Sequence, residues 1–327
     1  MDICIAQLGT FGDMILATPI IKTLKKLYPQ SNIHFIAGKK NHIVIKYHPL
    51  VNKIYVWDKN PFKLLQTIVS LKLKCFDYYV DPKDHFSRES LILSKIVVAK
   101  VKIGFNSFSH QTFDISIPDA IQNRSLHFTQ RLFQAFKTLQ ISAPKDDEIP
   151  KPDLYYPENS KQYLLHFLEK NQLLSNQYLL FNISASHPRK TFTEETLKDI
   201  FTKFTPPIPV VLCFEKKDKI LAKKLQQLSP KIKLFFSRQI LDVFALVEHS
   251  RAVITPDTSI VHIATAYHKP TLAFYSGLDD FFIKFHPNNP KAVVIRAQAE
   301  DHGIHSIPSN RVLLSINHFS KLIMEVL

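Results

Sequence analysis

Cysteine is scarce in this chain of 327 residues, which contains only Cys4, Cys75 and Cys213. The three residues are far apart and follow neither a C-x-x-C spacing nor a Cys/His spacing of the kind that holds metal ions. An odd, scattered set of this kind favours reduced thiols, and free cysteine is usually buried. We therefore expect three reduced thiols in the protein core.

Long apolar runs are also missing, since no segment reaches the roughly 18 uninterrupted apolar residues that a membrane-spanning helix needs. Residues 1–6 lack the basic start and apolar stretch of a signal peptide. Hydrophobic residues make up 45% of the chain and charged residues 21%, as in ordinary folded proteins. We expect a water-soluble cytoplasmic protein, large enough to fold as a monomer.

Acidic residues are few relative to basic ones, because 28 Asp and Glu oppose 42 Lys and Arg for a net charge of +14. Such an excess attracts polyanions, whether nucleic acid, acidic lipid or phosphorylated glycolipid. The alternative is a lysine-rich composition whose charges are only solvated. Because the sequence has no dense basic block and no nucleic-acid-binding motif, we do not expect nucleic acid as a partner.

Two ligand-binding motifs are absent as well. A nicotinamide dehydrogenase would carry G-x-G-x-x-G after its first strand and an acidic residue near the end of its second. The chain has only Gly9 and Gly12 in "LGTFGD", and its second apolar run ends in "IAGKK". There is also no Asp-x-Asp loop or His/Cys cluster that would hold a divalent ion on a diphosphate, so we expect no metal and no other cofactor.

What the chain does have is a regular alternation of β-branched or apolar runs with segments of helical period. The predicted strands cover residues 2–8, 32–38, 53–58, 76–82, 102–105, 178–184, 208–215, 231–237, 252–256 and 271–277. The predicted helices cover residues 14–29, 60–74, 88–100, 127–140, 161–173, 193–204, 217–228, 240–250, 259–269 and 315–327. This order predicts an α/β fold with parallel sheets covered by helices on both faces.

A proline-rich polar stretch, "APKDDEIPKPDLYYPENS", has the composition of an interdomain connection. It divides the chain into two α/β domains, residues 1–155 and 156–327. Open parallel sheets bind ligands beyond the carboxyl ends of their strands. The loops of interest are therefore "QLGTFGD", "NISASHPRK", "CFEKKD" and "TPDTS".

The first loop places Asp13 where a helix begins. An aspartate there can cap the helix by accepting a hydrogen bond from an unpaired backbone N–H group. It can also present a carboxylate to a ligand, since Gly9 and Gly12 allow close approach of the backbone. In "AVITPDTSIVHIATAYHK" a buried strand runs into a helix whose N-terminus suits a diphosphate. Here too, Asp257 or Thr258 could merely cap the helix, and His262 could merely pack.

Four blocks, in order, resemble glycosyltransferase family 9, the lipopolysaccharide heptosyltransferases. The blocks are "LGTFGDMILATPIIKTLKKLYPQSNIHFIAG", "FDYYVDPKDHFSRESLILSKIVVAKVKIGF", "NISASHPRKTFTEETLKDI" and "TPDTSIVHIATAYHKPTLAFYSG", and the similarity spans roughly residues 3–277. The resemblance implies a GT-B fold, in which two Rossmann-like doubly wound domains face across a cleft. The N-terminal domain would hold the acceptor and the C-terminal domain a nucleotide sugar, typically ADP-heptose. The final helix would pack back on the first domain.

The resemblance also implies roles for individual residues. Asp13 would take the proton from the acceptor hydroxyl, and Lys190 would neutralise the departing diphosphate, with Arg189 as an adjacent alternative. The donor-binding residues would be Ser184, Ser186, Lys190, Glu215, Asp257, Thr258, Ser259 and His262. The candidate acceptor contacts are Gly12, Lys39, Lys40, Arg88, Arg124 and Arg131. The acceptor would be a lipopolysaccharide core at the inner face of the cytoplasmic membrane, where the enzyme would be peripheral.

The chain also departs from the family pattern. Where the family often has Gly-Asp-Thr-Gly-Pro, Pro256 and Ser259 replace the glycines and Ile260 replaces the proline. Phe192 stands where tryptophan is common. The loss of glycine limits the approach of the backbone to a ligand. Two alternatives therefore remain: an enzyme of the same fold that uses another nucleotide sugar, and a non-catalytic scaffold that binds polyanions.

Overall fold

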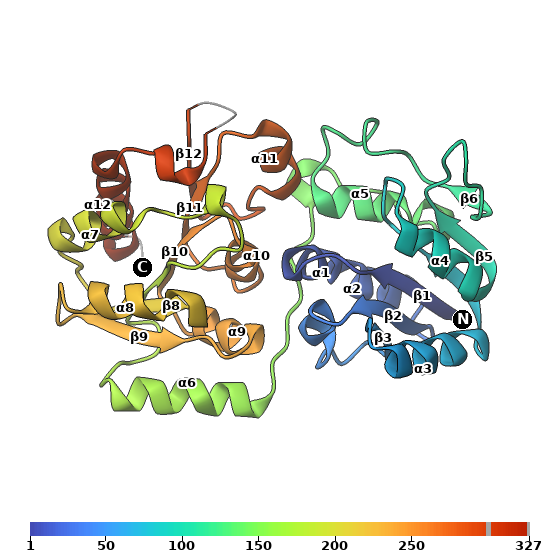
Figure 1. The fold of residues 1–327 in the computed structure, drawn as a ribbon, viewed down its shortest axis with the longest axis horizontal. Coiled ribbons are helices and arrows are strands. Elements are labelled where there is room, and N and C mark those ends of the chain that lie inside the picture. Colours follow the sequence, from blue (N-terminus) through green and yellow to red (C-terminus); the bar gives the residue numbers. More distant parts are fainter. Residues whose placement is uncertain (299–301, 326–327) are drawn as a thin grey trace. The chain divides into compact units, whose positions relative to one another are not determined.

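A computed structural model describes residues 1–298 and 302–325 of the chain. It contains two six-stranded sheets, ordered β3-β2-β1-β4-β5-β6 and β12-β11-β10-β7-β8-β9, and every paired strand is parallel (Figure 1). If the strands of each sheet are numbered 1 to 6 along the chain, both sheets have the doubly wound order 3-2-1-4-5-6. The predicted α/β fold with parallel sheets is confirmed.

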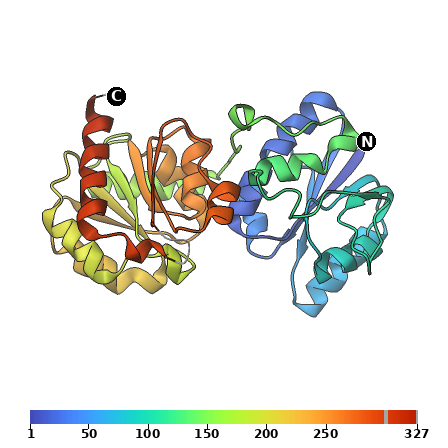
Figure 2. The same cartoon turned by 90° about the horizontal axis from the view of Figure 1, so that it is seen from above.

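The chain folds into two compact units, each built around one of the sheets. The first unit comprises residues 1–154 together with 283–286, and the second comprises residues 155–282 and 287–327. The buried residues of α12 (Ser309–Glu325) belong to the core of the second unit. Figure 2 shows this helix in red, beside the other helices and the sheet of that unit. This differs from the expectation that the final helix packs on the first domain. The physical reason is the apolar face of α12, which packs together with α7 (Glu194–Lys203).

The strands of the first unit are β1 (Asp2–Gln7), β2 (Asn32–Gly38), β3 (Lys53–Trp57), β4 (Cys75–Val80), β5 (Val98–Gly104) and β6 (Ile115–Ser116). Its helices are α1 (Phe11–Ala17), α2 (Pro19–Leu27), α3 (Pro61–Lys72), α4 (Arg88–Ile96) and α5 (Phe128–Gln134). Under α3 and α4, a core of buried side chains from the sheet surrounds Leu71 and Leu93. Burial of this kind provides the main stabilisation of such a layered fold.

The strands of the second unit are β7 (Leu179–Asn182), β8 (Val210–Phe214), β9 (Ile232–Phe236), β10 (Ala252–Pro256), β11 (Thr271–Tyr275) and β12 (Ala292–Arg296). Its remaining helices are α6 (Glu158–Lys170), α8 (Lys219–Gln226), α9 (Ile240–Glu248), α10 (Ser259–Ala266) and α11 (Asp279–Phe285), the last residues of which belong to the first unit. The helices α7, α8 and α12 cover one core, while α9 packs against both α6 and α10. Every residue of four strands, β7, β8, β10 and β11, is buried, and their sequences are short and mostly apolar, as is typical of parallel sheets.

Three sequence predictions need correction. The predicted helix 14–29 is two helices, because Pro19 has no backbone N–H to continue α1 and instead begins α2. The predicted helix 88–100 ends at Ile96, and β5 begins at Val98, because the β-branched residues here favour an extended backbone. The sequence analysis also overlooked β6, α11 and β12. The end of the predicted final helix, residues 326–327, lies outside the described residues.

The expectation for the cysteines is confirmed for two of the three. Cys4 and Cys213 are free and buried in strands, and burial raises the pKa of each thiol. Cys75 is free but exposed, because it is the first residue of β4 and lies at the end of the sheet. The prediction of a buried thiol was wrong for Cys75.

Candidate functional site

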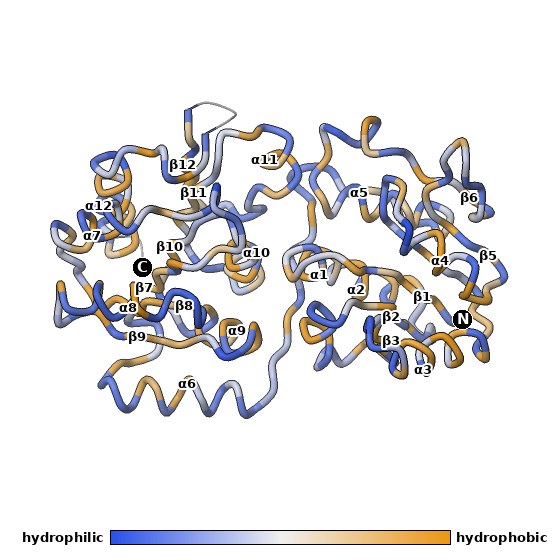
Figure 3. Tube along the Cα trace, in the orientation of Figure 1, coloured by the Kyte–Doolittle hydropathy of each residue, from blue (hydrophilic) through white to orange (hydrophobic). Residues whose placement is uncertain are grey.

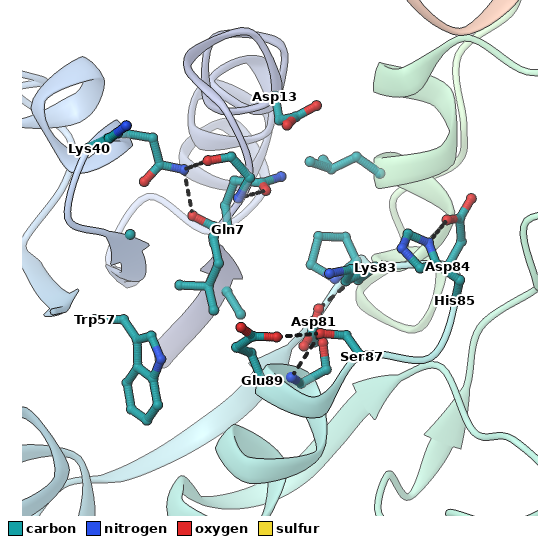
Figure 4. A pocket seen from close by; sticks show the side chains of 18 of the residues that line it. Gln7, Asp13, Lys40, Trp57, Asp81, Lys83, Asp84, His85, Ser87 and Glu89 are labelled. Atoms are coloured by element: carbon teal, nitrogen blue, oxygen red, sulfur yellow. Dashed lines mark hydrogen bonds and ion pairs between the residues drawn. The ribbon is translucent and has the colours of Figure 1, made fainter. Parts of the chain in front are cut away.

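A pocket of about 910 Å³ opens in the first unit beyond the carboxyl ends of its strands (Figure 4). The loops that follow β1 to β4 form most of its wall. The strand order reverses between β1 and β4, which is where doubly wound sheets bind their ligands. The charged residues that line the pocket are Asp13, Asp58, Asp81, Asp84, Glu89, Lys39, Lys40, Lys59, Lys83, Arg131 and Lys284.

Asp13 belongs both to the cap of α1 and to the wall of the pocket. The backbone N–H of Thr10 donates to Asp13 Oδ2 (2.6 Å), and the N–H of Asp13 donates to Thr10 Oγ1 (3.4 Å), so the two residues form a capping box. The half-buried carboxylate of Asp13 also lines the pocket. Because a backbone N–H engages one carboxylate oxygen, the side chain is held at the pocket wall.

The loop that leads to Asp13 is fixed from β1 onwards. The amide of the buried residue Asn41 donates to the carbonyl oxygens of Gln7 (3.0 Å) and Gly9 (2.9 Å). A Cβ atom at Gly9 would lie 2.3 Å from Asp13 Oδ2, closer than any normal contact. Gly9 is therefore required by the close approach of the Asp13 carboxylate, which is a packing constraint on the loop.

The opposite wall of the pocket is the segment after β4 (Figure 4). Asp84 is buried and accepts hydrogen bonds from His85 Nδ1 (3.1 Å) and Arg131 Nη1 (3.4 Å). Burial raises the pKa of Asp81, although hydrogen bonds from Ser90 and from the backbone of Lys83 oppose this rise. This wall therefore places two buried carboxyl groups, those of Asp81 and Asp84, beside the pocket.

Lys284 also lines the pocket and belongs to the part of α11 that is grouped with the first unit. Its ammonium nitrogen lies 5.6 Å from the ring centre of Phe128 and 5.3 Å from that of Phe285. Burial lowers the pKa of Lys284, while the charges of Asp84 and Asp13 raise it. Lys284 therefore contributes a basic side chain to the pocket that Asp13 also lines.

In the second unit, the strand order reverses between β7 and β10, and Asn182 connects the loops at this point. Its amide nitrogen donates to the carbonyl of Ser184 (3.0 Å) and to the hydroxyls of Thr255 (3.0 Å) and Thr258 (3.3 Å). Thr258 is the N-cap of α10, because its hydroxyl accepts the N–H of Ile260 (3.3 Å). Of the two roles that the sequence allows for Thr258, the structure shows the helix cap.

Lys190 and Asp257 form an ion pair of 2.7 Å between the loops after β7 and β10. The side chain of Asp257 is 5% exposed and that of Lys190 is 26% exposed. Burial raises the pKa of Asp257, and the charge of Lys190 opposes that rise. Asp257 thus positions the Lys190 ammonium group at the N-terminal end of α10.

The other predicted donor residues differ in accessibility. Ser184 is buried, donates its hydroxyl proton to Asp218 and accepts the N–H of Glu215 (2.9 Å), so its side chain supports the loop. Ser186 and Glu215 are exposed. Ser259 is half-buried at the first turn of α10, and His262 is buried one turn further on.

No group of three or more His, Cys, Asp or Glu side chains within residues 1–298 and 302–325 is arranged to hold a metal ion. No helix in the same ranges is long and apolar enough to cross a membrane.

The model of glycosyltransferase family 9 (heptosyltransferase) matches residues 64–307. The chain belongs to glycosyltransferase family 9. It is 23% identical over 317 residues to lipopolysaccharide heptosyltransferase 1 of Campylobacter coli, covering 90% of this chain and 89% of the relative. The family 9 member from Veillonella parvula has a similar fold, with a TM-score of 0.80 at 17% identity over 98% of this chain and 97% of that one. The E. coli heptosyltransferase WaaC, whose structure was solved with ADP, has a TM-score of 0.76 at 15% sequence identity. The match covers 98% of this chain and 100% of that one.

The predicted family is thereby confirmed, and the chain is a glycosyltransferase. Among the predicted acceptor residues of this family 9 enzyme, Lys39, Lys40 and Arg131 line the pocket of the first unit. The guanidinium group of Arg131 is hydrogen-bonded within the protein. Besides its bond to Asp84, its other nitrogens donate to the carbonyls of Leu126 (2.9 Å) and Arg124 (3.1 Å). Gly12, Arg88 and Arg124 are not among the described residues that line the pocket.

Sequence analysis missed the segment after β4 as part of the site. The string "VDPKD" was assigned to the end of a strand and to a family-like block, but not to the ligand-binding loops. The strand order would have identified it, because β4 pairs with β1 at the point of reversal. Lys284 had no such signal, because more than a hundred residues separate it from the rest of the pocket wall.

Proposed function

We propose that this family 9 enzyme transfers a heptose from ADP-heptose to an inner-core lipopolysaccharide acceptor, with inversion at the anomeric carbon and without a metal ion. We further propose that it acts as a monomer at the inner face of the cytoplasmic membrane. The observation that carries the proposal is the carboxylate of Asp13, which is fixed by a backbone N–H at the wall of a large pocket lined by acidic and basic side chains. Membership of a family of heptosyltransferases supports the substrate class.

The acceptor hydroxyl oxygen would attack the anomeric carbon while its proton passes to Asp13. The new carbon–oxygen bond forms as the bond between that carbon and the diphosphate oxygen breaks, and the bonding electrons leave with ADP. A positioned base contributes typically 10²- to 10⁴-fold to such a reaction. The mixed charges of the pocket suit an acceptor whose anionic groups accept hydrogen bonds from lysine and whose hydroxyl groups donate to carboxylates.

ADP would bind at the second unit, where the N-terminus of α10 and the Lys190 ammonium group lie at the reversal of strand order. Backbone N–H groups at such a terminus and a nearby cation compensate the charge of a diphosphate. Lys190 is the residue proposed to stabilise the leaving group, and Asp257 would hold it in place. The exposed carboxylate of Glu215 is available for ribose hydroxyls.

The test is transfer to truncated lipopolysaccharide by Asp13→Asn, together with calorimetric binding of ADP, UDP and GDP in EDTA. We expect kcat to fall at least 100-fold while ADP binding is unchanged, and we expect wild-type transfer to persist in EDTA. If no nucleotide binds, the scaffold alternative replaces the enzyme. If UDP or GDP binds more tightly than ADP, the donor is a different nucleotide sugar.

Thr10→Ala provides the matched control, because it removes the other half of the capping box and leaves the carboxylate intact. Loss of such a cap costs about 1 kcal/mol of stability. The control should therefore unfold at a lower temperature, yet retain transfer within a few fold of wild type. Equal loss of activity in both variants would mean that Asp13 acts only as a cap.

A further inference from the structure

Helix α3 presents large apolar side chains on the side that faces away from the sheet. Phe62, Leu65 and Val69 of α3 are 80%, 60% and 46% exposed, and its C-cap residue Leu73, which keeps a helical backbone, is 83% exposed. At 3.6 residues per turn, their spacing places them within an arc of about 80° on one face of the helix. We refer to these four residues as the outer stripe.

The outer stripe is distinct from the face by which α3 packs on its own domain. Leu71 is fully buried in the core, and the Thr67 hydroxyl donates to the carbonyl of Val56 in β3 (2.9 Å). A helix that needs only one apolar face for folding therefore carries a second one. Figure 3 shows hydrophobic residues recurring along the trace of α3. Contiguous exposed apolar residues of this kind mark interaction sites on soluble proteins.

The charges around the outer stripe identify the kind of partner. Residues 59–74 contain Lys59, Lys63, Lys72 and Lys74 and no aspartate or glutamate. Lys63 and Lys74 approach Asp58 (4.0 Å) and Asp2 (3.0 Å), whereas Lys59 and Lys72 are exposed. Apolar side chains flanked by lysine are the signature of a helix that lies in the interface of an anionic bilayer.

We propose that the outer stripe of α3 docks this enzyme on an anionic lipid bilayer, with the axis of the helix along the membrane surface. A second copy of the chain fits the stripe poorly. A stable dimer buries about 800 Å² on each partner, and the stripe runs over only three turns of one helix.

Helix α3 begins at the edge of the pocket, so docking of α3 on a membrane would bring the pocket close to a lipid-anchored acceptor. This inference about the acceptor rests on the proposed function. Asn60 is the N-cap of α3, and both Asn60 and Lys59 line the pocket that holds Asp13. A helix of 12 residues is about 18 Å long. With α3 at the membrane surface, the sugar end of a lipid-anchored acceptor reaches the pocket without leaving the bilayer.

Flotation of the full chain with lipid vesicles tests the proposal without using the transfer reaction. One set of vesicles is pure phosphatidylcholine. The other contains about one third phosphatidylglycerol, which supplies negative surface charge. The test variant carries Phe62→Gln, Leu65→Gln, Val69→Gln and Leu73→Gln. Its matched control carries Leu165→Gln and Leu314→Gln, which are exposed apolar positions in the second unit.

We expect wild type and control to float with the anionic vesicles, and the stripe variant to lose at least tenfold in partition coefficient. Lys59→Gln with Lys72→Gln should lose about as much, since each lysine near an anionic surface changes partition about fivefold. Lys219→Gln with Lys223→Gln, exposed on α8, is the control for net charge. Equal flotation of the stripe variant and wild type would overturn the proposal.

Two further readouts separate the alternatives. If sedimentation without lipid shows a wild-type dimer and a monomeric stripe variant, the stripe is an interface between copies and the proposal fails. Transfer to a water-soluble acceptor should be the same in wild type and in the stripe variant, while the KM for a vesicle-embedded acceptor rises in the variant. Normal flotation without any transfer would contradict the proposed function and leave the docking surface intact.

Discussion

The carboxylate of Asp13 caps helix α1 and also lines the pocket of the first unit. Its hydrogen bond comes from the backbone of Thr10, so no other side chain is needed to orient it. The sequence predicted both roles as alternatives, because aspartate before a helix is typical of a cap and of a ligand-facing loop. What the sequence could not predict is that one oxygen serves the cap while the same group lines the pocket.

Gly9→Ala should impair transfer by displacing Asp13. The added Cβ would meet the Asp13 carboxylate at 2.3 Å, so the side chain has to move. A displacement of about 1 Å at a reacting group costs roughly 100-fold in rate. We expect kcat to fall by 10- to 100-fold while ADP binding, measured by calorimetry, is unchanged.

Gly104→Ala is the control for this substitution. Its Cβ would meet the ring of Phe113 at 2.5 Å, in the core beneath the sheet, and would not meet Asp13. The control should lower the melting temperature yet retain the kcat of wild type. Full activity of Gly9→Ala would contradict the fixed position of the carboxylate.

Lys190→Met should destabilise the second unit in a way that depends on pH. Burial already raises the pKa of Asp257, and removal of the Lys190 charge raises it further in the folded state. The folded protein then binds a proton that the unfolded protein has lost, so stability falls as pH rises above the ordinary aspartate pKa of about 4. The deficit relative to wild type should be small at pH 4 and reach about 3 kcal/mol at pH 7.

Denaturant melts at several pH values measure this effect. The control is Lys198→Met, whose pair with Glu194 is on the exposed surface of α7 and contributes little to stability because water and salt screen it. A deficit of Lys190→Met that is the same at pH 4 and pH 7 would show that Asp257 does not depend on Lys190 for its charge.

At the scale of single elements, α12 is an integral part of the second unit. Val312, Ile316, Phe319 and Ile323 are buried in its core, and the Arg251 side chain donates to the carbonyl of Ile323 (3.2 and 3.0 Å). The helical period of this segment could be predicted from the sequence. Its partner could not, because an apolar face specifies burial without specifying which neighbour covers it.

Phe319→Ala tests the role of α12. Phe319 is 2% exposed, and truncation of a buried phenylalanine to alanine costs about 3–5 kcal/mol. Leu314→Ala, at a position on the same helix that is 67% exposed, should change stability by less than about 0.5 kcal/mol. Chemical denaturation of the two variants gives the comparison, and equal stability would mean that α12 does not hold the core together.

The boundaries of elements were harder to predict than their existence. Most helices and strands were predicted from hydrophobic period, but β5 was divided between a helix and a strand. Residues Val97 to Lys100 lie between an apolar helix and an apolar strand, and a short apolar run is compatible with either. Pairing of β5 with β4 decided the outcome, and this pairing is not visible in the local sequence.

At the scale of the whole molecule, the chain builds the same doubly wound sheet twice, each with its own reversal of strand order. The alternation in the sequence was sufficient to predict two parallel sheets. The order of strands within each sheet was not, since it depends on the pairing of distant segments. The site could therefore be predicted loop by loop, and the loop after β4 was missed.

Hydrogen exchange with and without ADP tests the proposal that the second unit, and not the first, binds the nucleotide. We expect ADP to slow exchange in residues 183–190 and 257–262, and to leave residues 81–84 of the first unit unchanged. At 100 times its dissociation constant, ADP should stabilise the state that binds it by about 2.7 kcal/mol. Protection of residues 81–84 without protection of residues 257–262 would place the nucleotide in the wrong unit for our proposal.

Residues 283–286 belong to the first unit although the chain on either side of them belongs to the second. A polypeptide that ends at Leu154 therefore lacks one part of the wall of its own pocket, including Lys284. Cutting the gene at the apparent domain boundary would yield two fragments, of which neither is a complete domain. A fragment that contains the whole first unit has to supply residues 283–286 together with residues 1–154.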